Sequence, residues 1–315
     1  MDIRYFEPLS RAYERMLQAL FRPFDIKKWF VVGFTAFLAG LTDCHGNNGG
    51  GGGQVRGAHD LEELIYFPRH VQEWLHDNPV WFMLIIVGLI VIFILAVLFA
   101  WLGSRGKFMF LDNVVHDRAQ VAKPWYEFRH EGNSLFLWSV AFGFFLLLVF
   151  GSYLVYCYAR LLAMYEYSYD FSAIWLPLAG MVLGLIALIM LTSYVELLVV
   201  DFVVPIMYRS RVGVWAGLQV FLPLFVSHVF SFIGYGLFTM VLWIFIVIGI
   251  IAAVVLTCCI GLLFLIIPYI STVVLLPVSY TMRAFSVEFL EQFGAEYQLF
   301  PRTGQGGVTQ GLPLS

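Results

Sequence analysis

The chain has 315 residues, of which 61% are hydrophobic and only 12% are charged, and its formal net charge is −3. A soluble globular domain carries about 25% charged residues, so this composition excludes an ordinary soluble protein. The small net charge gives no global excess for binding nucleic acid. Charge-free apolar runs long enough to cross a bilayer predict an all-α fold, a polytopic transmembrane helix bundle.

The segment 1–28 is predicted to form an amphipathic helix. In "PLSRAYERMLQALFRPF" the arginines lie off a face made by Leu9, Tyr13, Met16, Leu17, Leu20, Phe21 and Phe24. Such a helix either lies in the inner membrane interface, with its arginines toward anionic head groups, or packs on the transmembrane bundle. The segment lacks the uninterrupted apolar stretch of a signal peptide.

Six apolar segments are predicted to span the membrane. In chain order they cover residues 29–42, 80–102, 134–157, 173–200, 217–248 and 252–282. The first is unusually short, and between Gly217 and Met282 there is no Asp, Glu, Lys or Arg. That stretch is predicted as two long helices turning near Gly249, although three shorter helices, giving seven spans in total, also fit its length. Further amphipathic segments are predicted at 106–121 and 200–215.

The distribution of basic residues predicts the orientation of the chain. With six spans and the N-terminus inside, fifteen of the 18 Lys and Arg residues fall in inner segments. The outer segments contain Arg56, Arg69 and Arg160 alone. Seven spans would move only Arg283 and Arg302 outward. We therefore expect a protein of the cell's inner membrane with both termini cytoplasmic.

After the last span we predict an inner helix over 283–300 and a disordered tail over 301–315. In "RAFSVEFLEQFG" three phenylalanines share one helix face because they recur every fourth residue, at Phe285, Phe289 and Phe293. Gly294 is expected to end the helix. The phenylalanine stripe either docks a partner or packs under the bundle.

The outer segment 43–79 contains two candidate binding patterns. Its five-glycine run, 49–53, lacks the Lys and Ser/Thr that a phosphate-binding loop needs, so a flexible or turning connector is predicted. On a helix, His70, Glu73 and Asp77 would share one face, which makes them candidate metal ligands. The alternative is an amphipathic outer helix whose polar groups face water. No HExxH or Cys-x-x-Cys spacing supports a metal, and no cofactor is predicted.

Three ionisable residues near the membrane are candidate functional groups, because charges inside a bilayer are costly. Glu196 lies near the inner end of the fourth span, where Arg209 or Arg211 could pair with it. Asp201 could cap the segment that follows. His228, about a third of the way along the fifth span, either hydrogen-bonds a neighbouring helix or moves protons. The chain contains no Gly-x-Ser-x-Gly, HExxH or Walker motif and no intramembrane Asp pair, so no catalytic residue is predicted.

Two segments of the chain share a pattern. Asp112-Asn-Val-Val is followed thirteen residues later by Trp125, and Asp201-Phe-Val-Val is followed fourteen residues later by Trp215. Trp29 similarly leads into the first span. The pattern suggests three degenerate units, each with an interfacial segment, an aromatic anchor and a helical hairpin.

Four segments together resemble an uncharacterised prokaryotic family of multi-pass membrane proteins: "FRPFDIKKWFVVGFTAFLAG", "GKFMFLDNVV", "DFVVPIMY" and "MRAFSVEFLEQFG". The match covers about residues 20–294. More distantly, the layout is similar to the membrane domain attached to some glycerophosphodiester phosphodiesterases. The resemblance implies a polytopic inner-membrane protein with a glycine-rich outer connector. It implies no phosphodiesterase activity, because the chain has no room for that soluble catalytic domain.

Two functions from different classes remain open. The first is a non-enzymatic scaffold that organises lipid or a membrane or cytoplasmic partner protein through its inner interfacial helices. The second is a transporter or channel for a small solute or lipid. A scaffold predicts Glu196, Asp201 and His228 sealed by hydrogen bonds, whereas a transporter predicts a water-accessible cavity that reaches them. A membrane enzyme would need the outer histidines to bind metal.

Overall fold

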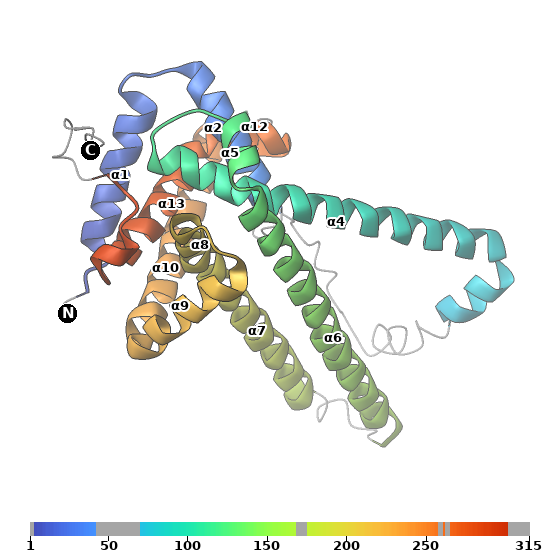
Figure 1. Ribbon diagram of the computed structural model, residues 1–315. Helices are drawn as coiled ribbons and strands as arrows, with labels where there is room; N and C mark the ends of the chain where they lie inside the picture. The colour runs from blue at the N-terminus through green and yellow to red at the C-terminus, as the bar shows by residue number, and fades with distance from the viewer. Residues whose placement is uncertain (1–2, 42–69, 168–174, 258–260, 262–264, 302–315) are drawn as a thin grey trace, which may run out of the picture. The chain divides into compact units, whose positions relative to one another are not determined.

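The computed structural model describes residues 3–41, 70–167, 175–257, 261 and 265–301. Every regular element in these ranges is a helix, which confirms the all-α prediction (Figure 1). The chain forms two compact units. The core unit comprises Met1–Leu41, Leu102–Leu135 and Leu197–Ser315, and the span unit comprises Thr42–Trp101 and Phe136–Glu196.

Four helices are long and apolar enough to cross a membrane. They are α4 (Pro79–Val115), α6 (Arg129–Tyr167), α7 (Trp175–Leu198) and α10 (Val229–Leu256). A fifth span results if α12 (Pro268–Val274) and α13 (Leu276–Glu291), which are bent by 66° at their junction, count as one broken span or a re-entrant loop. The described residues therefore show a membrane-embedded protein with four or five candidate spans.

Two predicted spans differ from the observed helices. The first corresponds to α2 (Ile26–Gly40), whose 15 residues rise about 22 Å at 1.5 Å per residue, less than the hydrocarbon thickness of about 30 Å. The helix predicted over 217–248 is interrupted at His228, which separates α9 (Val214–Ser227) from α10. The predicted turn near Gly249 is wrong, because α10 continues to Leu256. Much of the start of the predicted last span lies outside the described residues, as do the glycine run and the predicted tail beyond Pro301.

The core unit is built around the end of α4, where every residue from Gly103 to Val115 is buried. The short helix α5 (Ala122–Glu127) follows. The chain of α7 continues as the π-helical segment η2 (Val199–Val203) and then α8 (Val204–Ser210), which pack with α9. Because the end of α4 and most of η2 and α8 are buried, these segments show none of the one-sided pattern of a surface helix.

An aromatic cluster around Phe202 fills the core unit. The Phe202 ring centroid lies 4.8–5.9 Å from those of Phe221, Phe232, Tyr235 and Phe289. The predicted phenylalanine stripe of the last helix belongs to this core, since Phe285 and Phe289 are fully buried and Phe293 is nearly so. The stripe therefore packs under the bundle, which was one of its two predicted roles.

Helix α1 (Phe6–Phe21) packs along α13 (Figure 1). It buries Pro8, Ala12, Met16, Ala19 and Leu20. Of the predicted apolar face, only Met16 and Leu20 belong to this contact, and Tyr13 and Phe21 are exposed. A reciprocal pair fixes the start of the segment: the Arg4 amide N–H donates to Gln292 Oε1 and Gln292 Nε2 donates to the Arg4 carbonyl, both at 3.0 Å. The helix thus docks on the bundle with one side and leaves other apolar side chains exposed.

Helix α13 ends at Glu291, earlier than the predicted boundary at residue 300. A short 3₁₀ turn, η3 (Ala295–Tyr297), follows Gly294, whose φ of +156° favours glycine. The Glu291 carboxylate then accepts the backbone N–H groups of Leu299 and Phe300 at 2.8 and 2.7 Å. These bonds fold the end of the described chain back onto the helix.

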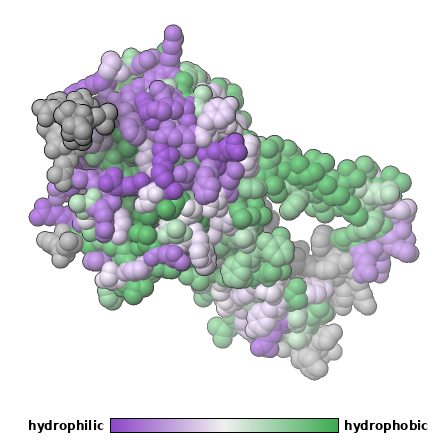
Figure 2. Space-filling view, in the orientation of Figure 1, coloured by the Kyte–Doolittle hydropathy of each residue, from purple (hydrophilic) through white to green (hydrophobic). Residues whose placement is uncertain are grey.

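The span unit contains the apolar part of α4 and most of α6 and α7. None of its described residues is buried. The apolar part of α4 is green along its whole length in Figure 2, as expected of a helix whose solvent is hydrocarbon. A polar contact joins α6 to α7, where the Tyr153 hydroxyl donates to the Met181 carbonyl at 2.7 Å.

Candidate functional site

The core unit holds buried or partly buried carboxylates on several elements, including Glu131 at the start of α6 (Arg129–Tyr167). Asp112 lies near the end of α4, Asp201 lies in η2 and Glu288 lies in α13. The side chains of Asp112 and Glu288 are 1% and 2% exposed, and that of Asp201 is 19% exposed. A buried charge is stable only when it is paired and hydrogen-bonded, so the partners decide what each carboxylate can do.

Asp112 is bound by Arg118, Tyr208 and His116. Arg118 donates from Nη2 and Nε at 2.7–3.0 Å, and the Tyr208 hydroxyl donates to Oδ1 at 2.8 Å. His116 Nδ1 lies 3.2 Å from the same oxygen and 3.2 Å from the Tyr208 hydroxyl. A carboxylate beside a histidine can orient a general base. Here the arginine already neutralises the carboxylate, so the arrangement favours a structural anchor.

Asp201 accepts a hydrogen bond from the Tyr235 hydroxyl at 2.9 Å. Arg283 Nη1 lies 3.8 Å from the other carboxylate oxygen and donates to the Val200 carbonyl at 2.9 Å. The side chain therefore links η2 to α10 and α13. Asp112 and Asp201, which occupy the same place in the shared sequence pattern, each accept a hydrogen bond from a tyrosine.

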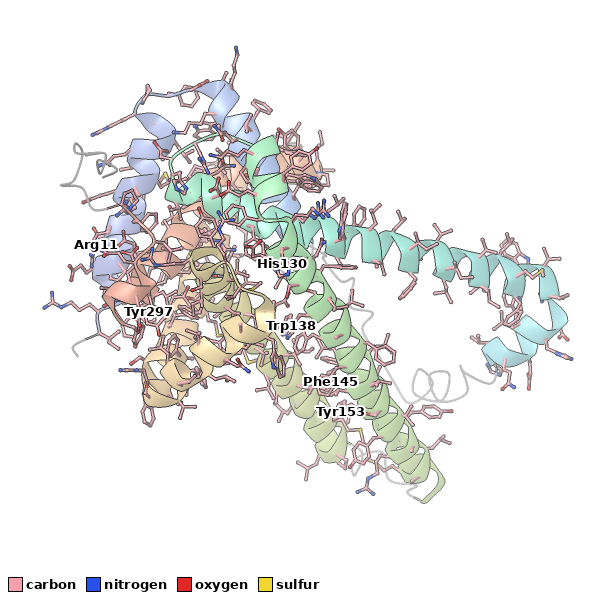
Figure 3. The ribbon with its side chains drawn as sticks, viewed as in Figure 1. Arg11, His130, Trp138, Phe145, Tyr153 and Tyr297 are labelled. Carbon is pink, nitrogen blue, oxygen red and sulfur yellow. The ribbon has the colours of Figure 1, made fainter. Side chains whose placement is uncertain are left out.

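Glu288 joins α13 to α1. Arg15 donates from Nε to Glu288 Oε1 at 2.6 Å, and Arg11 Nη1 lies 3.6 Å from Oε2. Figure 3 labels Arg11 on α1. Arg15 is thus turned into the protein, which fits the docked alternative for this helix rather than the one with its arginines toward head groups. No local sequence pattern indicates a role for Glu288, because Arg15 lies 273 residues away.

The other predicted ionisable groups occupy different surroundings. Glu196 is partly buried near the end of α7. Arg209 donates from Nε to the Glu296 carbonyl at 3.0 Å, and Arg211 forms an ion pair with Glu127. His228 lies between α9 and α10, with Nδ1 2.8 Å from the Ser227 hydroxyl and its ring 5.1 Å from that of Phe293. Glu196 belongs to the span unit, whereas Asp201 and His228 belong to the core unit.

The three metal candidates lie on a helix over residues 70–77. His70, Glu73 and Asp77 are all exposed there. Within the described ranges, no group of three or more His, Cys, Asp or Glu side chains is arranged to hold a metal ion. His45 and His59, which belong to the same predicted cluster, lie outside those ranges.

A cavity of about 120 Å³ opens in the core unit. Arg209, Glu296 and Tyr297 line its polar side, and Tyr297 is labelled in Figure 3. Burial raises the pKa of the Tyr297 hydroxyl, and the neighbouring Glu296 carboxylate raises it further. Neither Asp201 nor His228 lines this cavity.

An exposed surface of aromatic and basic side chains covers α1 and the start of α2. We call it the interface surface; it consists of Phe6, Tyr13, Phe21, Arg22, Phe24, Ile26 and Lys27. Phe6 is 76% exposed and Phe24 is 60% exposed. Exposed aromatic rings beside cations are typical of the lipid head-group layer.

Comparison with known proteins gives one match. A family model described as "Family of unknown function (DUF7544)" matches residues 4–295. No curated protein and no solved structure matches the chain. The match shows no link to the membrane domain of glycerophosphodiester phosphodiesterases.

Proposed function

Because the chain belongs to this family of unknown function, we propose a function from its geometry: a non-enzymatic membrane scaffold that organises anionic lipid through the interface surface. The observation that carries the proposal is the division of α1 into two apolar halves. One half is buried against α13, and the other, which includes Phe6 and Tyr13, is exposed beside cations. A helix with this division fits a position between a protein core and a layer of head groups.

The pairing of three carboxylates supports a scaffold over a transporter, although a fourth, the buried Glu131, has among the described residues only Arg211 Nη1, at 3.9 Å from Oε1. Asp112, Asp201 and Glu288 are each engaged by arginine, and Asp112 and Asp201 also by tyrosine. A transport site needs ionisable groups that water or a substrate can reach. Glu196, Asp201 and His228, the three residues predicted from the sequence, do not line the cavity of about 120 Å³. They do not line the groove of about 510 Å³ in the span unit either.

The proposal includes the predicted orientation, six spans with both termini cytoplasmic. The count of basic residues supports it, because fifteen of 18 fall in the segments assigned to the inside. In this arrangement α2 is a short first span, which locally thins the bilayer. The anionic cytoplasmic leaflet would then face Arg22 and Lys27 of the interface surface, and each cation near such a surface contributes about 1 kcal/mol.

To test the proposal, the full-length protein is purified in mild detergent and its bound lipids are quantified by mass spectrometry. The test variant is Arg22→Gln with Lys27→Gln, and the matched control, Arg22→Lys with Lys27→Arg, keeps both charges. We expect the test variant to lose most of the anionic lipid that the wild type and the control retain. Equal retention by all three proteins would exclude the proposal.

One observation favours transport as a second candidate. The 66° bend between α12 and α13 is the kind of helix break that forms substrate sites in transporters. A transporter would co-purify with a small solute, and solute retention would be insensitive to the Arg22 and Lys27 substitutions. The same mass spectrometry distinguishes these outcomes.

A further inference from the structure

The span unit contains an apolar groove between α6 and α7, with a volume of about 510 Å³. Its walls include Val149, Ser152, Tyr153, Tyr156, Gly184 and Leu188. The groove lies in the stretches of both helices that are apolar enough to cross a membrane. Its surroundings are therefore hydrocarbon rather than water.

Tyr153 fixes the spacing of the two helices at this groove. Its hydroxyl donates to the Met181 carbonyl at 2.7 Å, one turn before Gly184 (Figure 3). A Cβ atom at Gly184 would overlap the Tyr153 hydroxyl, so glycine is needed for the tyrosine to reach across. The contact fills one part of the space between the helices and leaves the groove beside it.

A cation lies close to the groove. Arg160 follows Tyr156 by one helical turn on the same face of α6; its Nε lies 3.4 Å from the Tyr156 hydroxyl and its guanidinium 5.9 Å from the ring centroid. Arg160 is the one Lys or Arg among the described residues of the span unit. At 1.5 Å per residue it lies about 10 Å further along α6 than Tyr153, which separates the cation from the apolar walls.

We infer that the groove binds one phospholipid of the leaflet at the α6–α7 connection. An acyl chain lies against the walls around Tyr153 and Gly184, and the phosphate is held by Arg160. The guanidinium matches a phosphate in geometry and charge. Close packing retains the acyl chain in the groove, because association in hydrocarbon is driven by dispersion contacts and not by the exclusion of water. The inference does not depend on the interface surface of the core unit.

The test uses the full-length protein in nanodiscs of equimolar phosphatidylcholine and phosphatidylglycerol. Native mass spectrometry measures the fraction of the protein that keeps one phospholipid bound after the protein is released from the nanodisc. Ala187→Trp fills the groove from α7, where Ala187 is part of the wall. The matched control Leu183→Trp places the same ring at a hydrocarbon-facing position of α7 outside the groove. Arg160→Gln removes the cation, and Arg160→Lys restores the charge. Circular dichroism establishes that each variant is folded.

We expect Ala187→Trp to abolish retention and Leu183→Trp to keep it. Arg160→Gln is expected to reduce retention about fivefold and Arg160→Lys to recover most of it, since one cation near the head groups contributes about that factor. Retention by Ala187→Trp at the wild-type level would overturn the inference, as would equal loss in both tryptophan variants. Because Arg22 and Lys27 are unchanged, these outcomes are separate from those that test the proposed function.

Discussion

The core unit and the span unit contrast in how their side chains are buried. The core unit holds a packed aromatic cluster and paired carboxylates, whereas none of the described residues of the span unit is buried. The change occurs within a single helix. No residue of α4 before Gly103 is buried, whereas every residue from Gly103 to Val115 is buried. Apolar side chains are abundant in both units, so composition does not cause the difference.

The difference follows from what surrounds the helices of each unit: those of the core unit pack against one another, whereas the apolar helices of the span unit face hydrocarbon. In water, burying apolar surface stabilises a fold by about 25 cal/mol per Å², whereas hydrocarbon gives no comparable gain. Helices in a bilayer depend instead on close packing and on a few polar contacts, such as the one between Tyr153 and Met181. We therefore expect the effect of a substitution to follow the burial of its site, both between the two units and within the core unit.

The largest contrast is expected for phenylalanine truncation. Phe202→Ala empties the centre of the aromatic cluster and is expected to destabilise the protein by about 3–5 kcal/mol. Phe144→Ala, at a 62% exposed position of the span unit, is expected to cost less than about 0.5 kcal/mol. Unfolding in mixed detergent–SDS micelles measures both. Similar losses at the two positions would show that the span unit has a packed core of its own.

A second contrast compares two aspartates of the core unit. Asp112→Ala removes the partner of Arg118 and is expected to cost about 3 kcal/mol, the lower end for a broken buried pair, because Arg118 is 24% exposed. Asp117→Ala breaks the surface pair with Lys28 and is expected to cost at most about 1 kcal/mol. The free energy of unfolding is measured as above. If Asp117→Ala proved the more costly, the assignment of Asp112 as a structural anchor would be wrong.

A third contrast uses two glycines of the same helix. A Cβ at Gly106 would approach the Ala39 amide nitrogen to 2.5 Å, so Gly106→Ala forces α2 away from α4 and is expected to cost about 2 kcal/mol. Nothing lies within 4 Å of a Cβ at Gly88, in the span unit, where alanine is expected to be neutral or to stabilise by up to about 1 kcal/mol. Thermal unfolding of both variants gives the sign of each change in stability. Two changes of the same sign would contradict the prediction.

The smallest contrast concerns the two arginines that bind Glu288. Arg15→Gln removes the bond of 2.6 Å and is expected to cost about 1.5–2 kcal/mol, since Arg11 remains to neutralise the carboxylate. Arg11→Gln removes a longer and more exposed contact and is expected to cost at most about 1 kcal/mol. Limited proteolysis of α1 alongside unfolding shows whether the helix detaches. A larger effect of Arg11→Gln would reverse the assigned roles.

The sequence predicted the helical class and the apolar cores of α4, α6, α7 and α10, because hydrocarbon selects long apolar runs that are visible residue by residue. It did not predict that α4 continues to Val115. A helix buried on all sides shows no amphipathic period, so "GKFMFLDNVV" was interpreted as a separate interfacial segment. The 15-residue length of α2 and the break at His228 depend on packing partners that no local pattern encodes.

The candidate site was predictable only in part. The repeated Asp-x-Val-Val pattern singled out Asp112 and Asp201, and both accept a hydrogen bond from a tyrosine. Their partners Tyr208 and Tyr235 lie 96 and 34 residues away, beyond the reach of spacing arguments. No local sequence pattern identified Glu288 as a site residue. Such pairs are set by the fold rather than by periodicity.

The docking of α1 on α13 imposes an order on biosynthesis. Arg4 and Gln292 are 288 residues apart, so at about 5–20 residues per second the first helix waits tens of seconds for its binding site to be translated. During that time its apolar stripe must be covered by something else, and the membrane surface beside the translocation machinery is the nearest apolar phase. The newly made protein would therefore begin as a lipid-bound helix and complete its fold only when the last helix arrives.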